Sequence, residues 1–141
     1  MSDAPLSSPN LKGLEQFAYE PERVEKPWGY ELIWAVAEEY VGKLLFVNAG
    51  HRLSLQFHRQ KDESWYLLEG RAELEFAAAG QTTTTTEVVT PGAAFRIRPG
   101  TVHRIRALDD TLMLEVSTPH LDDVVRLDDE YGRAETSPPT G

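Results

Sequence analysis

Two histidines, a glutamate and a glutamine have the types and the spacing of a metal site. Gln56 and His58 are two residues apart, so on a strand their side chains point to the same face. Glu63 follows after a polar stretch suited to a turn, and Pro99-Gly100 precedes His103 at the expected start of another strand. Two imidazoles, a carboxylate and an amide oxygen suit one divalent ion: zinc, manganese, iron, cobalt or nickel. Four protein ligands leave one or two positions open, as in a catalytic site.

The elements that position these residues are predicted to be short strands. Runs of branched and aromatic residues alternate with polar ones and are separated by glycines and prolines, a pattern typical of a β-sandwich or barrel. The expected strands are Tyr30–Val36, Tyr40–Asn48, His51–His58, Trp65–Leu68, Ala72–Phe76, Glu87–Thr90, Ala94–Arg98, Val102–Ala107 and Leu112–Val116. The sequence therefore predicts an all-β fold.

The ends of the chain are expected to differ from this unit. Residues 1–25, with several prolines and charges, are interpreted as an N-terminal arm, and residues 134–141 as a flexible tail. A single folded domain is expected over residues 26–133. Its last part, Leu121–Glu130, is predicted to form a short helix with Val124, Val125 and Leu127 toward the core.

Composition excludes several function classes. The chain has 141 residues, of which 26% are charged, and its net charge is −9. That acidic balance argues against nucleic-acid binding, which needs a positive field. No cysteine is present, which excludes disulfides and thiolate nucleophiles. No apolar run is long enough to cross a membrane and no signal peptide is visible, so we expect no membrane contact and a cytoplasmic location.

The candidate ligands lie in two motifs that resemble those of the cupin superfamily. Gly50-x7-His58-x4-Glu63-x6-Gly70 is similar to the first motif, with Gln56 in place of its usual first histidine. Gly92-x6-Pro99-Gly100-x2-His103 is similar to the second. The resemblance implies a double-stranded β-helix, or jelly-roll barrel, with a metal ion inside one end. By similarity its ligands would be Gln56, His58, Glu63 and His103.

A narrower resemblance is to the cupin domain of type II mannose-6-phosphate isomerases. It rests on Leu53–Trp65, on Pro27-Trp28-Gly29 and on Asp122–Arg126 followed by Tyr131-Gly132-Arg133. Departures lie beside the site: Lys61 stands where these isomerases have an arginine, and Ser64 where they have a histidine. They concern the substrate more than the metal.

Three further residues are candidates for catalysis. Lys43, in an otherwise apolar strand, lies either at an exposed edge or inside the barrel, where it could act as a base. Glu115 either faces outward or shares the cavity-facing side with Met113 and moves protons. By resemblance Arg133 would contact the substrate. Strand alternation turns another set of cations outward; these are Arg96, Arg98, Arg104 and Arg106.

These features favour a metal-dependent aldose–ketose isomerase acting on a sugar or a sugar phosphate, with the metal as Lewis acid. The alternative is a non-catalytic, metal-containing, sugar-binding cupin, and a third hypothesis is an iron-dependent cupin dioxygenase. A homodimer is expected, with the N-terminal arm covering a sheet edge.

Overall fold

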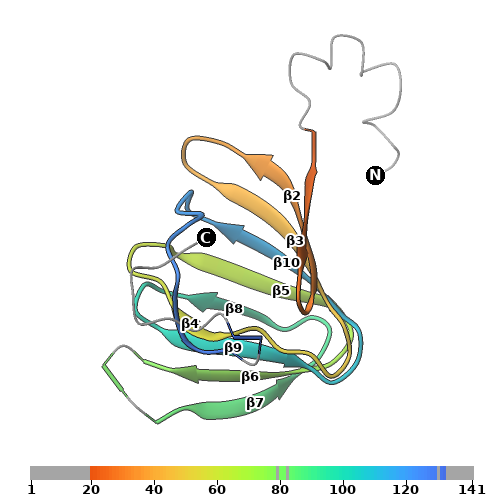
Figure 1. Cartoon of the computed structure of the whole chain (residues 1–141), viewed down its shortest axis with the longest axis vertical. Coiled ribbons are helices and arrows are strands. Elements are labelled where there is room, and N and C mark those ends of the chain that lie inside the picture. The colour runs from red at the N-terminus through yellow and green to blue at the C-terminus, as the bar shows by residue number, and fades with distance from the viewer. Residues whose placement is uncertain (1–19, 79, 82, 130, 133–141) are drawn as a thin grey trace.

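Two antiparallel β-sheets face each other in the computed structural model of the chain (Figure 1). It describes residues 20–78, 80–81, 83–129 and 131–132. The strands are β1 (Glu22–Lys26), β2 (Gly29–Val36), β3 (Val41–Val47), β4 (Leu55–Phe57), β5 (Glu63–Glu69), β6 (Ala72–Ala77), β7 (Thr85–Val89), β8 (Ala94–Ile97), β9 (Val102–Ala107), β10 (Thr111–Ser117) and β11 (Val125–Asp128).

The strand order is that of a jelly roll. Sheet A has the order β1-β2-β3-β10-β5-β8, and sheet B has the order β11-β4-β9-β6-β7. Strands far apart in the sequence are therefore neighbours, such as β3 with β10 and β4 with β9. This arrangement confirms the predicted all-β barrel built from two facing sheets.

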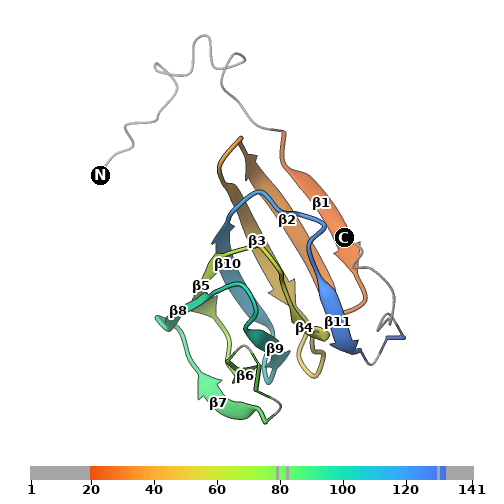
Figure 2. The same ribbon diagram turned by 90° about the vertical axis from the view of Figure 1, so that its left-hand side faces the viewer.

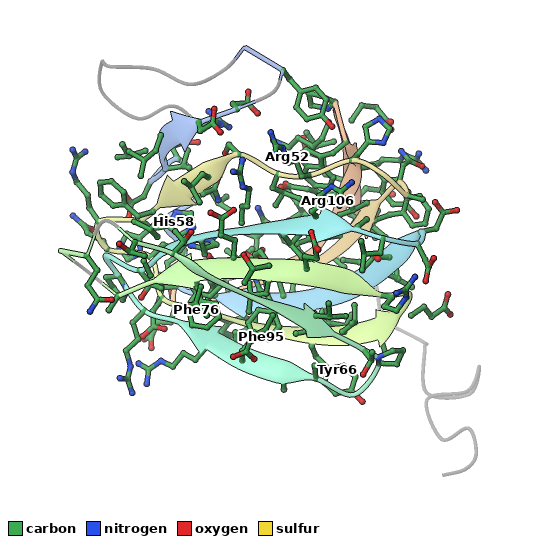
Figure 3. The ribbon with its side chains drawn as sticks, turned by 90° about the horizontal axis from the view of Figure 1, so that it is seen from below. Arg52, His58, Tyr66, Phe76, Phe95 and Arg106 are labelled. Atoms are coloured by element: carbon green, nitrogen blue, oxygen red, sulfur yellow. The ribbon has the colours of Figure 1, made fainter. Side chains whose placement is uncertain are left out.

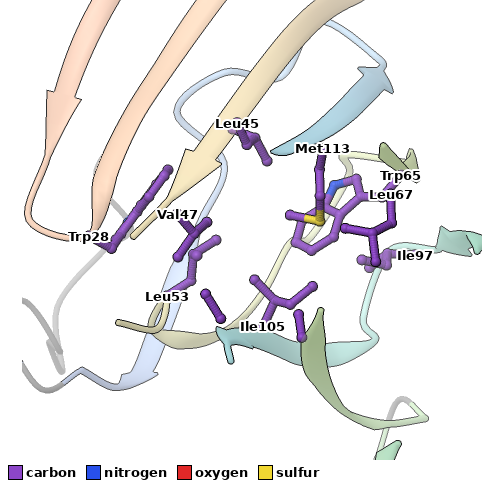
Figure 4. Close-up of a cluster of buried hydrophobic side chains, with 11 residues drawn as sticks. Trp28, Leu45, Val47, Leu53, Trp65, Leu67, Ile97, Ile105 and Met113 are labelled. Atoms are coloured by element: carbon purple, nitrogen blue, oxygen red, sulfur yellow. The ribbon is translucent and has the colours of Figure 1, made fainter. Parts of the chain in front are cut away.

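The apolar core fills the space between the sheets. Inward residues of sheet A, such as Leu45, Leu67 and Met113, are fully buried and meet Ile105 from sheet B (Figure 4). Each strand supplies them at every second position because side chains alternate across a strand. The core occupies one part of the barrel and leaves the rest for polar groups.

The predicted helix over Leu121–Glu130 is wrong for the residues that the structure describes. Residues 121–122 lie in a turn, residues 123–124 are irregular, and β11 follows and pairs with β4 (Figure 2). Arg126 is buried whereas Leu127 is half exposed, which is the period of a strand. The unpaired edge of β4 offers backbone hydrogen bonds, and branched residues such as Val125 favour an extended chain.

The expected arm and tail lie mostly outside the described residues. Residues 22–25, at the end of that arm, belong to β1 and pair with β2. Residues 1–19 and 133–141, which include Arg133, are not described. Among the described residues, no helix is long and apolar enough to span a membrane.

Candidate metal centre

Three of the four predicted ligands meet inside the barrel. His58 directly follows β4 and His103 lies on β9, so both come from sheet B, whereas Glu63 begins β5 in sheet A. Glu63 Oε2 is 2.8 Å from His58 Nε2 and 3.5 Å from His103 Nε2. The three ligand atoms lie within 4.8 Å of one another, and all three residues are buried. The pairing of β4 with β9 thus brings together His58 and His103, which are 45 positions apart in the sequence, and Glu63 reaches them from the facing sheet.

The histidines are held in the tautomer that suits a metal. The Nδ1–H group of His58 donates to the carbonyl oxygen of Asp123 at 2.5 Å, and that of His103 to the carbonyl oxygen of Thr101 at 2.9 Å. In a neutral imidazole each Nε2 then carries a free lone pair. Both lone pairs point to the carboxylate of Glu63.

The three converging atoms lack hydrogen-bond partners. His58 Nε2, His103 Nε2 and Glu63 Oε2 are buried without a hydrogen bond of acceptable geometry to any described residue. Buried polar atoms in native structures almost always have a partner. A divalent cation bound between them would satisfy all three, so the residues present fit a metal ion.

The second oxygen of Glu63 is held by other groups. Trp65 Nε1 donates to Oε1 at 2.8 Å, and Lys61 Nζ lies 3.5 Å from the same atom. Burial alone would raise the pKa of Glu63, but the positive charge of the nearby Lys61 ammonium acts to lower it, and the pKa lies well below its usual range. The carboxylate is therefore ionised and presents one oxygen, Oε2, to the site.

Gln56 lies beside the three ligands. It is paired with His103 across the β4–β9 ladder, and its side chain lines the cavity. The Ser54 hydroxyl donates to Gln56 Oε1 at 2.6 Å, which orients the amide and leaves the oxygen one lone pair. A role of Gln56 as the fourth ligand stays a prediction.

Lys43 and Glu115 both point into the barrel. Lys43 is buried on β3, and its ammonium forms a 3.2 Å ion pair with Glu31 of β2. Glu115 is buried on β10, and its Oε2 is 3.0 Å from Lys61 Nζ. The inward alternative is therefore the observed one for both residues. Each candidate base has an ion-pair partner.

Lys61 was noted in the sequence only as a departure beside the site, and its role in the charge network was missed. Its ammonium lies between the carboxylates of Glu63 and Glu115. Burial would lower the pKa of Lys61, but these two carboxylates raise it above its usual value, so it stays a cation. Burial and the charge of Glu63 raise the pKa of Glu115. The spacing Lys61-x-Glu63 was the available signal, since residues two apart on an extended chain share a face.

A cavity of about 260 Å³ opens next to the metal ligands. His58 and Gln56 form part of its wall, together with apolar residues such as Trp28 and Leu53. The charged residues that line it are Lys26, Lys43, Lys61, Arg126, Glu31 and Asp122. Cations thus outnumber anions in the wall, although the whole chain is acidic.

Asp123 ties the cavity wall to the metal ligands. Its carboxylate accepts hydrogen bonds from the backbone N–H groups of Arg59, Gln60 and Lys61 at 3.0, 2.6 and 2.9 Å. These residues connect His58 to Glu63. Burial would raise the pKa of Asp123, but the backbone donors lower it. Asp123 thus fixes the site in two ways: its carbonyl oxygen accepts the hydrogen bond of His58, and its carboxylate binds the loop between His58 and Glu63.

The cationic set of four arginines lies outside the site, as strand alternation predicts. Arg96 is exposed and pairs with Asp62, and Arg98 is exposed as well. On the outer face of sheet B, Arg104 pairs with Glu75. These cations therefore do not line the cavity beside the metal ligands.

Comparisons with known proteins identify the family of the chain. The model of the family "Mannose-6-phosphate isomerase C-terminal" matches residues 15–129. The xanthan biosynthesis protein XanB of Xanthomonas campestris pv. campestris (strain B100) is 33% identical over 119 residues, which cover 79% of this chain and 24% of XanB. The chain thus spans about a quarter of the length of this relative.

Solved structures share the fold at low identity. KdgF from Halomonas sp. superposes with a TM-score of 0.60 at 22% identity, over 72% of this chain and 89% of KdgF. Oxalate decarboxylase from Bacillus subtilis does so with a TM-score of 0.67 at 18% identity, over 77% of this chain and 30% of that enzyme. These are cupins, and the family match covers most of the chain. The chain belongs to the cupin superfamily, in the mannose-6-phosphate isomerase C-terminal family.

Proposed function

We propose that the chain is a metal-dependent aldose–ketose isomerase acting on a sugar or a sugar phosphate. The observation that carries the proposal is the convergence of His58 Nε2, Glu63 Oε2 and His103 Nε2 beside a cationic cavity. A divalent ion held by these atoms, with Gln56 as the proposed fourth ligand, would supply Lewis acidity toward two adjacent substrate oxygens. Membership of the family supports the choice of a sugar as the ligand.

The residues of the cavity would bind and orient an anionic sugar. Lys61 stays protonated between two carboxylates, so it offers a fixed positive charge beside His58. Lys43 and Lys26 line the same wall. A phosphate or carboxylate group of a substrate would be favoured over a neutral group because it balances this excess of cations.

Proton transfer between neighbouring carbons would fall to Lys43 or Glu115. Lys43 borders the cavity, and its ammonium donates a hydrogen bond to Glu31. The Glu115 carboxylate contacts Lys61 Nζ, and burial together with the charge of Glu63 raises its pKa, which favours the protonated form that a general acid needs. Arg133, outside the described residues, is proposed from the family resemblance as a substrate contact.

A non-catalytic sugar-binding cupin is the second candidate. The ion pairs of both candidate bases favour it, since Lys43 is held by Glu31 and Glu115 by Lys61. A group engaged in a buried pair is less available to move a proton than a free one. In that case the metal and the cavity would only orient the ligand.

Proton NMR in heavy water distinguishes the two candidates. The protein is loaded in turn with zinc, manganese, iron, cobalt and nickel and mixed with aldoses, ketoses and their 6-phosphates, mannose 6-phosphate among them. Deuterium entering at carbon 1 or carbon 2 supports an isomerase. Ligand binding without deuterium exchange supports the binding protein. If the protein shows no binding and no exchange with any of these sugars, both candidates are contradicted.

Two histidine variants assign the activity to the site. His58→Ala is expected to abolish metal binding and exchange together, because it removes one of three converging ligands. His51→Ala is the matched control, since His51 stacks on Tyr131 outside the ligand cluster. Full exchange in His58→Ala would contradict the mechanism.

A further inference from the structure

Arg126 is a buried cation that faces the cavity. It lies on β11, is only 7% exposed, and lines the cavity together with Gln56 and His58. Burying a guanidinium is costly unless polar or anionic groups surround it. With five N–H donors in a fork, an arginine can keep a protein partner and still bind two oxygens of an anion. Arg126 is therefore suited to hold an anionic group of a ligand.

The strand register places Arg126 in one row with the candidate metal site. Arg126 pairs with Gln56 across β11 and β4, and Gln56 pairs with His103 across β4 and β9. Neighbouring strands lie about 4.8 Å apart, so the backbones of Arg126 and His103 are separated by roughly 10 Å along the ladder. Gln56, the proposed fourth ligand, lies between them. The row thus joins a metal end of the cavity to a guanidinium end.

The guanidinium end lies at the edges of the two sheets. β11 is an edge strand of sheet B, and β1 is an edge strand of sheet A. Lys26 of β1 lines the same cavity as Arg126, so each of these edge strands contributes one cation. The residues that converge at the metal end belong to inner strands or directly follow one; they are His58, Glu63 and His103. A ligand lying along the row would keep one end near the edge strands and extend the other toward the metal ligands.

The carboxylates at the inner end of the cavity disfavour an anion there. Lys61 lies between the carboxylates of Glu63 and Glu115, and Lys43 is 3.2 Å from Glu31. A ligand anion that approached either lysine would meet these negative charges at short range in a buried site, where Coulomb repulsion is strong. The charged group of a ligand is therefore better placed at the edge-strand end, and its uncharged end near the metal ligands.

The size of the cavity limits the ligand to a single sugar unit. The volume of about 260 Å³ is below the ~300–1,000 Å³ of typical ligand pockets. An open-chain six-carbon sugar, with bonds of about 1.5 Å and one polar contact at each end, extends over roughly 10 Å. That length matches the separation between the two ends of the row. A nucleotide sugar would exceed both the volume and the length.

We propose that Arg126, together with Lys26, forms a subsite for an anionic group at carbon 6 of the sugar, either a phosphate or a carboxylate. The carbonyl end of the same sugar would then reach the metal end of the row. Arg126 is thus a specificity-determining residue, which selects sugars that are charged at the end opposite their carbonyl group. This inference rests on the proposed function, because it takes the ligand to be a sugar that binds at the metal ligands.

Isothermal titration calorimetry of the zinc-loaded full chain tests the subsite. The ligands are mannose and glucose, their 6-phosphates, their 1-phosphates and the corresponding uronates. At least one sugar charged at carbon 6 should bind ~10-fold or more tightly than its neutral form, because charge-assisted hydrogen bonds are strong. The comparison of 6-phosphate with uronate identifies the preferred anion. The 1-phosphates, charged at the wrong end, should show no such gain.

Two arginine variants assign this gain to the subsite. Arg126→Met removes the guanidinium but keeps an unbranched side chain, so it should weaken binding of the preferred charged sugar at least ~10-fold. Its affinity for the neutral sugar and for zinc should stay at the native value. Arg106→Met is the matched control, since Arg106 pairs with Glu73 on the outer face of sheet B and lies apart from His58 (Figure 3). It should bind every ligand as the native chain does.

Circular dichroism establishes that each variant is folded. If Arg126→Met does not fold, Lys26→Met replaces it with the same expected selective loss. A native chain that binds charged and neutral sugars equally would overturn the proposal. So would a tight 1-phosphate complex, or a variant that loses affinity for charged and neutral sugars alike, which indicates a structural role.

Deuterium exchange at carbon 1 or carbon 2 separates this proposal from the proposed function. Charge-selective binding that depends on Arg126 but is accompanied by no exchange contradicts the isomerase alone. Exchange that is equally fast in Arg126→Met and in the native chain, at ligand concentrations below saturation, contradicts the subsite alone. A chain that binds none of these sugars contradicts both.

Discussion

The Asp123 carboxylate offers a direct test of how the metal ligands are positioned. It accepts three backbone hydrogen bonds from the loop that links His58 to Glu63, at distances from 2.6 to 3.0 Å. The substitution Asp123→Asn keeps the shape of the side chain but replaces one acceptor oxygen by an NH₂ group. At least one of the three bonds is lost, and the others lose the assistance of the charge.

The expected effect on stability is moderate. A hydrogen bond to a charged group contributes about 1.5–3 kcal/mol, and solvent replaces part of that at a half-exposed loop. We therefore expect Asp123→Asn to lower the free energy of unfolding of the metal-free protein by about 1–3 kcal/mol, measured by urea denaturation. Outer groups that orient ligands typically change metal affinity by about 10–100-fold, so zinc affinity should fall by at least ~10-fold in a chelator competition.

The neighbouring residue supplies the control. Asp122→Asn removes the same charge one position away, from an exposed side chain at the cavity wall. It should leave both the unfolding free energy and the zinc affinity close to native values. Equal behaviour of the two variants would refute the role assigned to Asp123, because any shared effect would come from net charge alone.

Three further substitutions, one of them a control, test the fold. Gly70 has φ +95°, and a Cβ built there would lie 2.3 Å from a backbone oxygen, so Gly70→Ala should lower the free energy of unfolding by about 1–3 kcal/mol. Gly50→Ala, at φ +85° with open space around it, should cost less. Equal costs of the two substitutions in thermal unfolding would contradict the clash at Gly70. Hydrogen bonding by Thr84 and the charge of Arg104 lower the pKa of Glu75, so its ionised form stabilises the fold above its unfolded pKa, and this stabilisation is lost as pH falls through the lower folded value. Glu75→Gln should therefore cost about 1 kcal/mol at pH 7 and progressively less below about pH 4.5; a cost that does not change with pH would contradict the assignment.

Much of the barrel and part of the site could be predicted from the sequence. Local alternation and turn glycines specify strands because side chains repeat every second residue and only glycine readily adopts positive φ. The motif spacing also identified His58, Glu63 and His103, which the structure brings together. These features depend on short stretches of chain, so a single sequence carries them.

The sequence could not show which residues on other strands contribute side chains to the candidate site. Strand alternation places Glu115 on the same face as Met113 but does not show whether this face is buried. In the structure β10 pairs with both β3 and β5, and the face with Met113 and Glu115 points into the barrel. The same pairing places Glu115 next to Lys61.

The C-terminal segment illustrates the same limit. Its pattern between residues 121 and 130 is compatible with a helix, and only the free edge of β4 makes β11 the better structure. Asp123 reaches a loop more than sixty residues away in the sequence, which no local pattern reveals. The sequence by itself predicted most of the strands and the grouping of His58, Glu63 and His103, because these follow from local periodicity and from the spacing of the motifs. The tertiary structure alone decided the charge network and the anchoring of the ligands, because those depend on which strands become neighbours.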